Sequence, residues 1–583
     1  DSFYKNLTKR QGKREILVAF GKPIHGFIDA TAMKQKVLEL SFSVWEKVMS
    51  KRKPLMHHWL NSAKSNLFKE AAVDAQGTKL NNLKFIAAVL MFVKTLKAAL
   101  GNEKNVGVLL PSSSIGAIIN MTLMVMGKVP VNLNYTLSPE VMEKALKKAN
   151  ISQVITSEKF LDKLNAKGFD FSQVVADKAL FMENLGKSIT KANKVRSFLT
   201  AFLAPQWWIK LRYFADVSLE DNATILFSSG SEGDPKGIEL SHKNLLTNIK
   251  QIGELLNFHK DDVILNSLPI FHSFGLTVTT LLPLCEGIKM VSVADPTDGA
   301  TVGKMCARHR VSILFGTSTF FRLYVRNKKF HPLMLQNVRM VIAGAEKLKA
   351  DVKEAFKLKF GLEIYEGYGA TETAPVASVN MPNLLNPETL QEFTFNQAGT
   401  VGMPLPGTII KIVEPESLQE LPVGEDGLIL IGGGQVMKGY LNAPEKTAEV
   451  IVEIDGVRYY KTGDKGHIDH NGFITIVDRY SRFAKVGGEM ISLGSVEEKL
   501  SQVFDEETQF VAVSLSDDKK GESIVLLIKS ALSLDEINER IKGLNVPPIM
   551  LPSQVFLVDE IPMLGSGKVD FKGAKNQAMS LVE

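Results

Sequence analysis

The chain has 583 residues, of which 45% are hydrophobic and 23% are charged, so a disordered or fibrous protein is excluded and at least two domains are expected. The formal net charge of +6 is a mild excess without the clustered basic field of a nucleic-acid-binding protein, and we expect no nucleic acid as a partner. The two cysteines have no metal-ligand spacing and imply no disulfide framework, which indicates a reducing compartment.

The first 60 residues contain too little apolar sequence to form a core of their own. Residues 15–20 are a short apolar run that predicts a strand, and a charged helical pattern follows through Trp45. We therefore expect no independent domain in this region.

From about residue 61 to residue 478, short β-branched strands alternate with helical segments, which predicts parallel α/β layers. The predicted strands are residues 106–110, 224–227, 263–265, 290–293, 313–315 and 340–342. The longest stretch with few charges, residues 106–136, is interrupted by prolines and glycines. It fits a strand, a turn, a helix and a strand better than a helix that crosses a bilayer.

An aromatic and basic segment, residues 198–214, lies within this region. It places Trp207 and Trp208 beside Lys210 and Arg212, a mixture typical of segments that lie in a membrane interface. A packed pair of helices broken at Pro205 explains the same residues equally well. Both interpretations stay open on the sequence alone.

The predicted strand 224–227 leads into a loop rich in glycine and hydroxyl groups. Glycine lets backbone N–H groups approach phosphate oxygens, while hydroxyls add donors and a lysine adds positive charge. The spacing is not that of a Walker A loop. The predicted phosphate-binding residues are Ser228, Ser229, Gly230, Ser231, Gly233, Lys236 and Gly237.

After about residue 400 the pattern changes to strands separated by glycines. Residues 466–476 predict a β-hairpin with a tight turn at Asn471 and Gly472. Beyond Arg479, the apolar strands 510–514 and 523–528 belong to a short α+β stretch. A second domain of about 100 residues fits there.

Further motifs follow the phosphate loop in a fixed order. They are Gly344-Ala345-Glu346-Lys347, Tyr368-Gly369-Ala370-Thr371-Glu372, Tyr460-Lys461-Thr462-Gly463-Asp464, Arg479 and the loop from Pro562 to Lys568. Taken alone, each of these motifs could be an ordinary turn, loop or helix start. The ordered set, however, resembles the adenylate-forming superfamily of acyl-CoA synthetases, luciferases and adenylation domains. The chain departs from that family at Glu232, where threonine is usual, so Glu232 either points away from phosphate or helps to hold the metal.

This resemblance implies an α/β fold with a large adenylation domain of layered sheets and helices, residues 61–480. A smaller, mobile α+β domain, residues 481–583, is expected to carry the catalytic lysine. Residues 1–60 form a separate segment. ATP and Mg²⁺ are the expected cofactors.

The resemblance also implies the roles of single residues in the reaction, in which a carboxylate attacks the α-phosphate of ATP. Lys568 would bridge these two groups, Thr371 would contact phosphate and Glu372 would help to hold Mg²⁺. The remaining nucleotide contacts are expected at Gly344, Ala345, Glu346, Tyr368, Gly369, Asp464 and Arg479. The carboxylate of Asp464 suits the two ribose hydroxyls, which need an acceptor with two oxygens.

For the acid, Phe271 and His272 lie in a segment that resembles the border of the acyl pocket, although a lone histidine also serves structural roles. Downstream aromatic and aliphatic residues wall an apolar channel or belong to the core; they are Phe315, Phe320, Phe321, Leu323 and Tyr324. No aspartate is evident for a substrate ammonium group. We expect a fatty acid.

The small domain is expected to rotate about Ser481, where relatives usually carry aspartate or lysine. Lys485 and Gly488 lie in the segment that faces the thiol after the rotation. Because a hinge needs only a tolerant backbone, serine permits this motion.

A closer resemblance covers residues 479–490 and 561–571, which look like the acyl-[acyl carrier protein] synthetase half of bacterial bifunctional lysophospholipid acyltransferases. Residues 14–50 look like the tail of the acyltransferase half, although His25 and Asp29 lack its catalytic spacing. This implies transfer of a fatty acid to acyl carrier protein, for fatty acid reuse or phospholipid acylation. The expected location is the cytoplasm or the cytoplasmic face of the inner membrane, with peripheral membrane contact.

Two alternatives stay open. A long-chain acyl-CoA synthetase differs in its thiol acceptor, CoA. A nucleotide-binding sensor without catalysis is favoured by Glu232 and Ser481, whereas Lys568, Glu372 and Asp464 argue against it.

Overall fold

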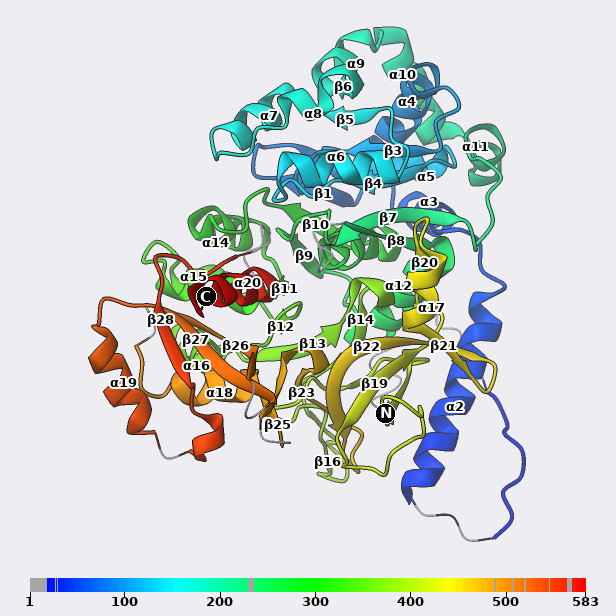
Figure 1. The fold of residues 1–583 in the computed structure, drawn as a ribbon. Coiled ribbons are helices and arrows are strands. Elements are labelled where there is room, and N and C mark those ends of the chain that lie inside the picture. The colour runs from blue at the N-terminus through cyan, green and yellow to red at the C-terminus, as the bar shows by residue number, and fades with distance from the viewer. Residues whose placement is uncertain are drawn as a thin grey trace.

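Parallel strands make up most of the two largest sheets, as the alternation of strands and helices predicts (Figure 1). The computed structural model describes residues 18–26, 28, 30–228, 235–486, 489–505, 508–517, 521–544, 546–563 and 569–582. One sheet has nine strands, in the order β17 (Met403–Pro404), β14 (Val376–Val379), β13 (Ile364–Gly369), β12 (Met340–Ala343), β11 (Ile313–Gly316), β9 (Val263–Asn266), β10 (Lys289–Ser292), β1 (Glu70–Asp74) and β2 (Lys79–Asn81). Strands β13 to β1 are parallel, and β14 and β2 run antiparallel to their neighbours.

The second sheet has seven strands, in the order β20 (Gly439–Tyr440), β8 (Lys236–Ser241), β7 (Asn222–Ser228), β4 (Val129–Asn132), β3 (Asn105–Val108), β5 (Val154–Thr156) and β6 (Ala179–Phe181). Strands β7 to β6 are parallel, whereas β8 pairs antiparallel with β7. All six strands predicted between residues 106 and 342 are confirmed within a residue or two.

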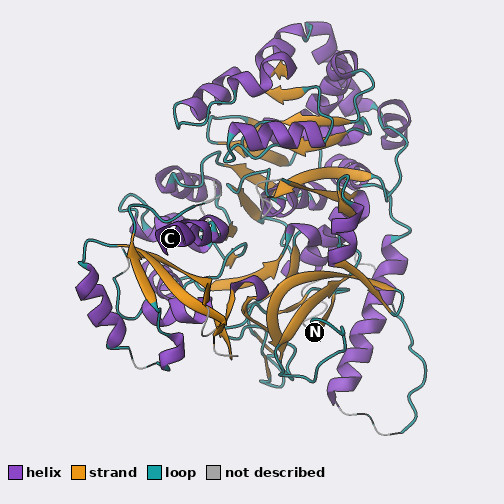
Figure 2. Cartoon of the chain, in the orientation of Figure 1, coloured by secondary structure: helices purple, strands orange, loops and turns teal. Residues whose placement is uncertain are grey.

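A layer of helices shares one hydrophobic core with both sheets. These helices are α3 (Leu55–Ser65), α4 (Asn82–Leu100), α5 (Ser114–Val125) and α12 (His242–Leu256). Every residue of α5 except Ile115 is buried, as expected for a helix enclosed on all sides. Figure 2 shows helices in purple on both faces of the sheets. The outer helices are α6 (Pro139–Lys148), α7 (Glu158–Asn165), α8 (Ser172–Val175), α9 (Met182–Ser188), α14 (Gly299–His309), α15 (Ser318–Arg326) and α16 (Ala350–Phe360).

A third, antiparallel sheet carries the predicted hairpin. Its strands are β18 (Ile409–Val413), β19 (Gly427–Gly432), β22 (Val457–Ile468), β21 (Ile451–Ile454) and β23 (Ile474–Arg479). The turn between β22 and β23 contains Gly472 with a φ of 86°, a conformation that favours glycine. The predicted tight turn is confirmed.

The last hundred or so residues form a smaller α+β domain with hydrophobic clusters of its own. Its elements are β24 (Phe483–Val486), β25 (Glu489–Ser492), α18 (Leu493–Leu500), β26 (Gln509–Asp517), β27 (Gly521–Lys529), α19 (Leu534–Lys542), β28 (Gln554–Leu557) and α20 (Phe571–Val582). The predicted fold class, a large α/β domain followed by a smaller α+β domain, is confirmed.

The N-terminal region packs against the large domain. Helix α2 (Ala30–Met49) lies along the third sheet, and a Cβ atom on Gly407 would lie 2.4 Å from Trp45. The expected boundary at residue 60 falls inside α3, whose Leu55 and Trp59 belong to the main core. The core of the large domain therefore begins before residue 61, and the other domain limits stay predictions.

The strand predicted at residues 15–20 is wrong where it can be compared. Residues 18–20 pair with no described strand, and the side chains of Val18 and Phe20 are 73% and 91% exposed. An apolar run becomes a strand only where another strand pairs with it. Residues 15–17 lie outside the described residues. Among the helices of the described ranges, none combines the length and apolarity that crossing a bilayer requires.

Candidate active site

A single cleft of about 3650 Å³ runs between the large and small domains and into the helix layer. The ends of β7, β8, β12, β13, β22 and β23 reach it, so residues far apart in the sequence meet there. Thirteen of the predicted site residues line it: Ser228, Lys236, Phe271, His272, Gly344, Ala345, Glu346, Tyr368, Gly369, Thr371, Glu372, Asp464 and Arg479.

The two described ends of the predicted phosphate loop are held by β7 and β8, where Ser228 pairs with Lys236. The Lys236 ammonium group lies 5.3 Å from the centre of the Tyr440 ring. Gly237 is buried behind the loop, where a Cβ atom would lie 3.1 Å from Leu441 and Phe227. Ser229, Gly230, Ser231, Glu232 and Gly233 lie outside the described residues.

The segment after β13 presents Thr371 and Glu372 to the cleft. Gly369 has no room for a side chain, because a Cβ atom there would lie 1.8 Å from the Pro375 carbonyl oxygen. The Ser273 hydroxyl donates to Thr371 Oγ1 at 3.3 Å. Tyr440 Oη donates to Glu372 Oε1 at 2.9 Å, and burial together with the Glu372 charge raises the pKa of Tyr440.

Asp464 is held between Tyr368 and Arg479. Tyr368 Oη donates to Asp464 Oδ2 at 2.6 Å, and Arg479 Nε donates to Oδ1 at 3.2 Å across the β22–β23 pair. Burial raises the pKa of Asp464, and the Arg479 charge opposes that shift. Each carboxylate oxygen keeps a second lone pair, so the group can still accept from two hydroxyls.

The predicted adenine-binding segment follows β12. Gly344 is buried against the Phe274 ring, and Ala345 has a φ of 71°, an unusual value for alanine. Glu346 Oε1 accepts from the Thr319 backbone N–H at 2.6 Å, so this carboxylate is bound to the start of α15. Backbone groups are therefore what this segment offers to a ligand.

Lys347 extends from the same segment to the small domain. Its ammonium group lies 3.1 Å from Glu498 Oε2 on α18, and both side chains are exposed. This ion pair links the two domains on the rim of the cleft.

An apolar branch of the cleft enters the helix layer. Phe271 packs edge-on against Tyr135 at 4.6 Å, and the half-buried His272 ring lies 4.6 Å from Phe271. The branch is lined by side chains of α4, α5 and α12 together with Val278, namely Ala88, Phe92, Ile115, Ile118, Ile252, Leu255 and Val278, whereas Phe315, Phe320 and Leu323 line the cleft from β11 and α15. Phe321 and Tyr324 are instead packed in the core behind it. The predicted channel residues therefore divide between cleft and core.

Two of the remaining predicted residues, Ser481 and Lys485, do not line the cleft. Ser481 and Lys485 are exposed, on a short turn and on β24. Lys485 is predicted to face the thiol only after a domain rotation, so its role stays a prediction. Gly488 and Lys568 lie outside the described residues. Met563 and Val569, on either side of Lys568, pair as an antiparallel bridge and line the cleft.

Sequence reasoning missed several residues that support the site. Tyr440, Ser273 and Phe274 contact predicted residues, and Arg482 forms a 2.6 Å ion pair with Glu497 at the small-domain wall. Ser273 and Phe274 lie in the segment that resembles the border of the acyl pocket, and Arg482 lies in the run 479–490, whereas no local pattern marks Tyr440. Only the fold brings them to their partners.

The donor set of the cleft fits Mg²⁺ held with a polyphosphate. Within the described ranges, no group of three or more His, Cys, Asp or Glu side chains is arranged to hold a metal ion. Mg²⁺ commonly binds one or two carboxylates together with substrate phosphates and water. Glu372, beside the Thr371 hydroxyl on the cleft, would supply such a carboxylate.

The sequence and the fold both match known proteins. Residues 62–441 match the family described as AMP-binding enzyme. Long-chain-fatty-acid–CoA ligases of Salmonella typhimurium and Bacillus subtilis are each 26% identical, over 84% and 86% of this chain and 89% and 90% of their own lengths. The structure of Bacillus subtilis o-succinylbenzoate CoA synthetase with its acyl-adenylate intermediate superposes with a TM-score of 0.73, at 22% identity, over 90% of this chain and 98% of that one.

Proposed function

Because the chain belongs to the AMP-binding enzyme family and is an ATP-dependent ligase that forms an acyl-adenylate, we propose that it activates a long-chain fatty acid and transfers it to acyl carrier protein. The observation that carries the proposal is the cleft itself. It joins the residues expected to bind the nucleotide, Thr371, Glu372, Asp464 and Arg479, to apolar side chains that α4, α5 and α12 contribute to its lining. A fatty acid matches this apolar branch in shape and polarity.

The reaction follows from this arrangement. A carboxylate oxygen of the acid attacks the α-phosphorus of ATP, the bond to the β-phosphate breaks, and pyrophosphate leaves. Asp464 and Arg479 would hold the ribose, Lys236 would offset phosphate charge, and the Thr371 hydroxyl would donate to a phosphate oxygen. Glu372 would hold Mg²⁺, which would supply further neutralisation of the phosphate charge. The thiol then attacks the acyl carbonyl and AMP leaves.

The acceptor is the finer part of the proposal. Residues 479–490 and 561–571 resemble the acyl carrier protein-specific relatives, whereas the two relatives named above are CoA ligases. Acylation of a carrier protein would serve fatty acid reuse or phospholipid synthesis, in the cytoplasm or at the cytoplasmic face of the inner membrane. Residues 1–60 would then resemble the tail of an acyltransferase domain.

Radiolabelled palmitate and ATP, offered with either holo-acyl carrier protein or CoA, decide between the two acceptors. We expect a larger kcat/KM for thioester formation with the carrier protein. A larger value with CoA would make the chain an acyl-CoA synthetase. Failure to exchange labelled pyrophosphate into ATP in the presence of fatty acid would instead favour a non-catalytic sensor.

The apolar branch predicts which acids are accepted. Ala88 on α4 lines it, and phenylalanine at this position would fill part of the space that a long alkyl chain occupies. We expect Ala88→Phe to lower kcat/KM for palmitate at least about tenfold, because several buried CH₂ groups lose their contacts, and to affect octanoate much less. Lys84→Phe, at an exposed position of the same helix, is the matched control. Equal losses for both acids would place the alkyl chain elsewhere.

A further inference from the structure

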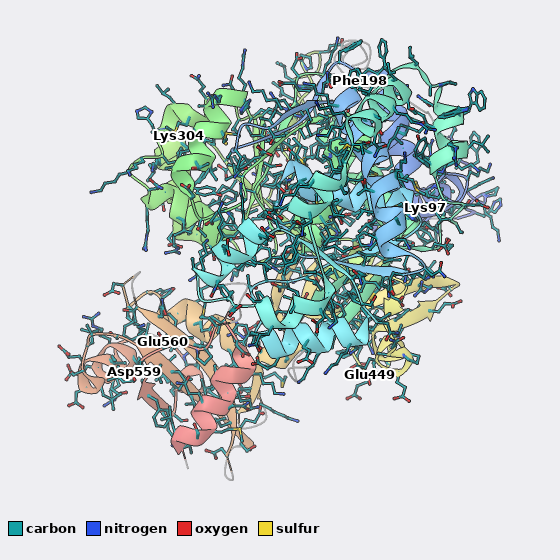
Figure 3. All side chains as sticks on the ribbon, turned by 90° about the horizontal axis from the view of Figure 1, so that it is seen from above. Lys97, Phe198, Lys304, Glu449, Asp559 and Glu560 are labelled. Carbon is teal, nitrogen blue, oxygen red and sulfur yellow. The ribbon has the colours of Figure 1, made fainter. Side chains whose placement is uncertain are left out.

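Helices α10 (Lys191–Leu203) and α11 (Gln206–Tyr213) present an apolar surface to solvent. Pro205 separates them, which confirms the predicted helix pair. The exposed side chains, here called the α10–α11 patch, are Val195, Phe198, Leu199, Phe202, Leu203, Trp207, Trp208 and Leu211, joined by Phe68 beside Phe202. Phe198 is labelled in Figure 3.

Helix α10 buries small side chains and exposes large apolar ones, which is the reverse of an ordinary surface helix. Its buried residues are the small Ser197 and Ala201, which pack against α4, whereas its large apolar residues recur at helical spacing on the exposed side. Leu203, Trp207 and Leu211 are 70%, 65% and 79% exposed. Contiguous exposure of this kind marks a surface that another phase or molecule covers.

The charge around the patch indicates what covers it. Residues 184–215 contain six lysines and arginines and no aspartate or glutamate: Lys187, Lys191, Lys194, Arg196, Lys210 and Arg212. Without these six cations, the rest of the chain would carry equal numbers of basic and acidic residues. The segment that exposes these large apolar side chains therefore carries six positive charges and no negative one.

From this coincidence we infer that the α10–α11 patch docks on an anionic lipid surface, with Trp207 and its apolar neighbours inserted among the acyl chains. Tryptophan flanked by basic residues favours the headgroup region, and each nearby cation adds electrostatic attraction to anionic lipids. A thiol acceptor is a poorer occupant, because α10 and α11 lie at the end of the molecule remote from the small domain (Figure 1).

The patch also lies close to the apolar branch. Helix α4, against which α10 packs, contributes Ala88 and Phe92 to the lining of the cleft. Docking would therefore hold the fatty-acid-binding part of the molecule next to the phase in which fatty acids dissolve. The docking itself does not depend on which acid or thiol the enzyme uses.

Vesicle binding by the full chain, without substrates, tests this inference. We expect the protein to co-sediment with vesicles of equal parts phosphatidylcholine and phosphatidylglycerol, and binding to weaken with salt as screening shortens the Debye length from about 10 Å at 0.1 M to about 3 Å at 1 M. Lipids with brominated acyl chains should quench tryptophan fluorescence. Quenching should fall in Trp207→Ser and be lost in Trp207→Ser/Trp208→Ser, which removes both tryptophans of the patch.

The triple variant Leu203→Ser/Trp207→Ser/Leu211→Ser should lose at least about tenfold in vesicle affinity, since it removes three large apolar side chains. Leu333→Ser/Leu358→Ser/Leu384→Ser is the matched control, because these leucines are 64%, 81% and 60% exposed elsewhere and should leave affinity unchanged. Lys191→Glu/Lys194→Glu should weaken binding to anionic vesicles more than binding to vesicles of phosphatidylcholine alone. Equal vesicle binding by the patch and control variants would overturn the inference. So would self-association in sedimentation velocity that only the patch variant abolishes, which would assign the patch to a second copy of the chain.

Discussion

Replacing Lys568 with alanine is expected to slow acyl-adenylate formation by about 10³-fold while the Kd for ATP changes little, because the lysine's interactions are strongest in the transition state. Charge develops between the attacking carboxylate and the α-phosphate, where a cation is most effective. Met563 and Val569 bring both ends of the Lys568 loop to the cleft. The measurement is fatty-acid-dependent exchange of labelled pyrophosphate into ATP.

Transfer of the acyl group from the adenylate to the thiol should not need Lys568. A lysine that bridges the carboxylate and the α-phosphate acts before the adenylate exists, so Lys568→Ala should still transfer acyl groups from supplied acyl-adenylate to the thiol. Lys572→Ala, at an exposed position of α20, is the control and should keep both activities. Near-normal exchange by Lys568→Ala would remove the residue from its assigned role.

Replacing Glu372 with glutamine is expected to lower kcat about 10²-fold and to raise the Mg²⁺ concentration needed for half-maximal rate. Glutamine keeps the size of the side chain and an oxygen that can accept from Tyr440, so the change removes mainly the negative charge. Steady-state rates across a Mg²⁺ titration, with ATP saturating, measure both effects.

Tyr440→Phe separates the charge of Glu372 from its orientation. This variant removes the 2.9 Å hydrogen bond and leaves the carboxylate in place, so we expect less than about a tenfold loss and an unchanged Mg²⁺ requirement. If the two variants lost activity equally, with the same Mg²⁺ dependence, Glu372 would act through Tyr440 rather than on the metal.

The strands of the large domain were predictable because they are short, β-branched and separated by helices, a pattern that buried parallel strands require. The apolar run at residues 15–20 has the same local composition but, at residues 18–20, no strand beside it. The local sequence shows only that a segment can form a strand. Pairing depends on what the fold places next to it.

The candidate site divides in the same way. Asp464 and Arg479 were expected from ordered motifs, and both line the cleft from the paired strands β22 and β23. Tyr440 was not, because its partner Glu372 is 68 residues away and nothing in the residues around either one signals the contact. Phe320 and Phe321 are neighbours in sequence, yet one lines the cleft and the other packs in the core. Only the direction of each side chain distinguishes them.

The ion pair between Lys347 and Glu498 has a consequence for the catalytic cycle. Both side chains are in water, 77% and 66% exposed, so the pair stabilises this arrangement of the domains by no more than about 1 kcal/mol. The proposed rotation of the small domain must break it. Because this ion pair is weak, thermal motion suffices to break it. The pair therefore adds little to the free-energy difference between the two domain arrangements, and the ligand bound at each step decides which arrangement prevails.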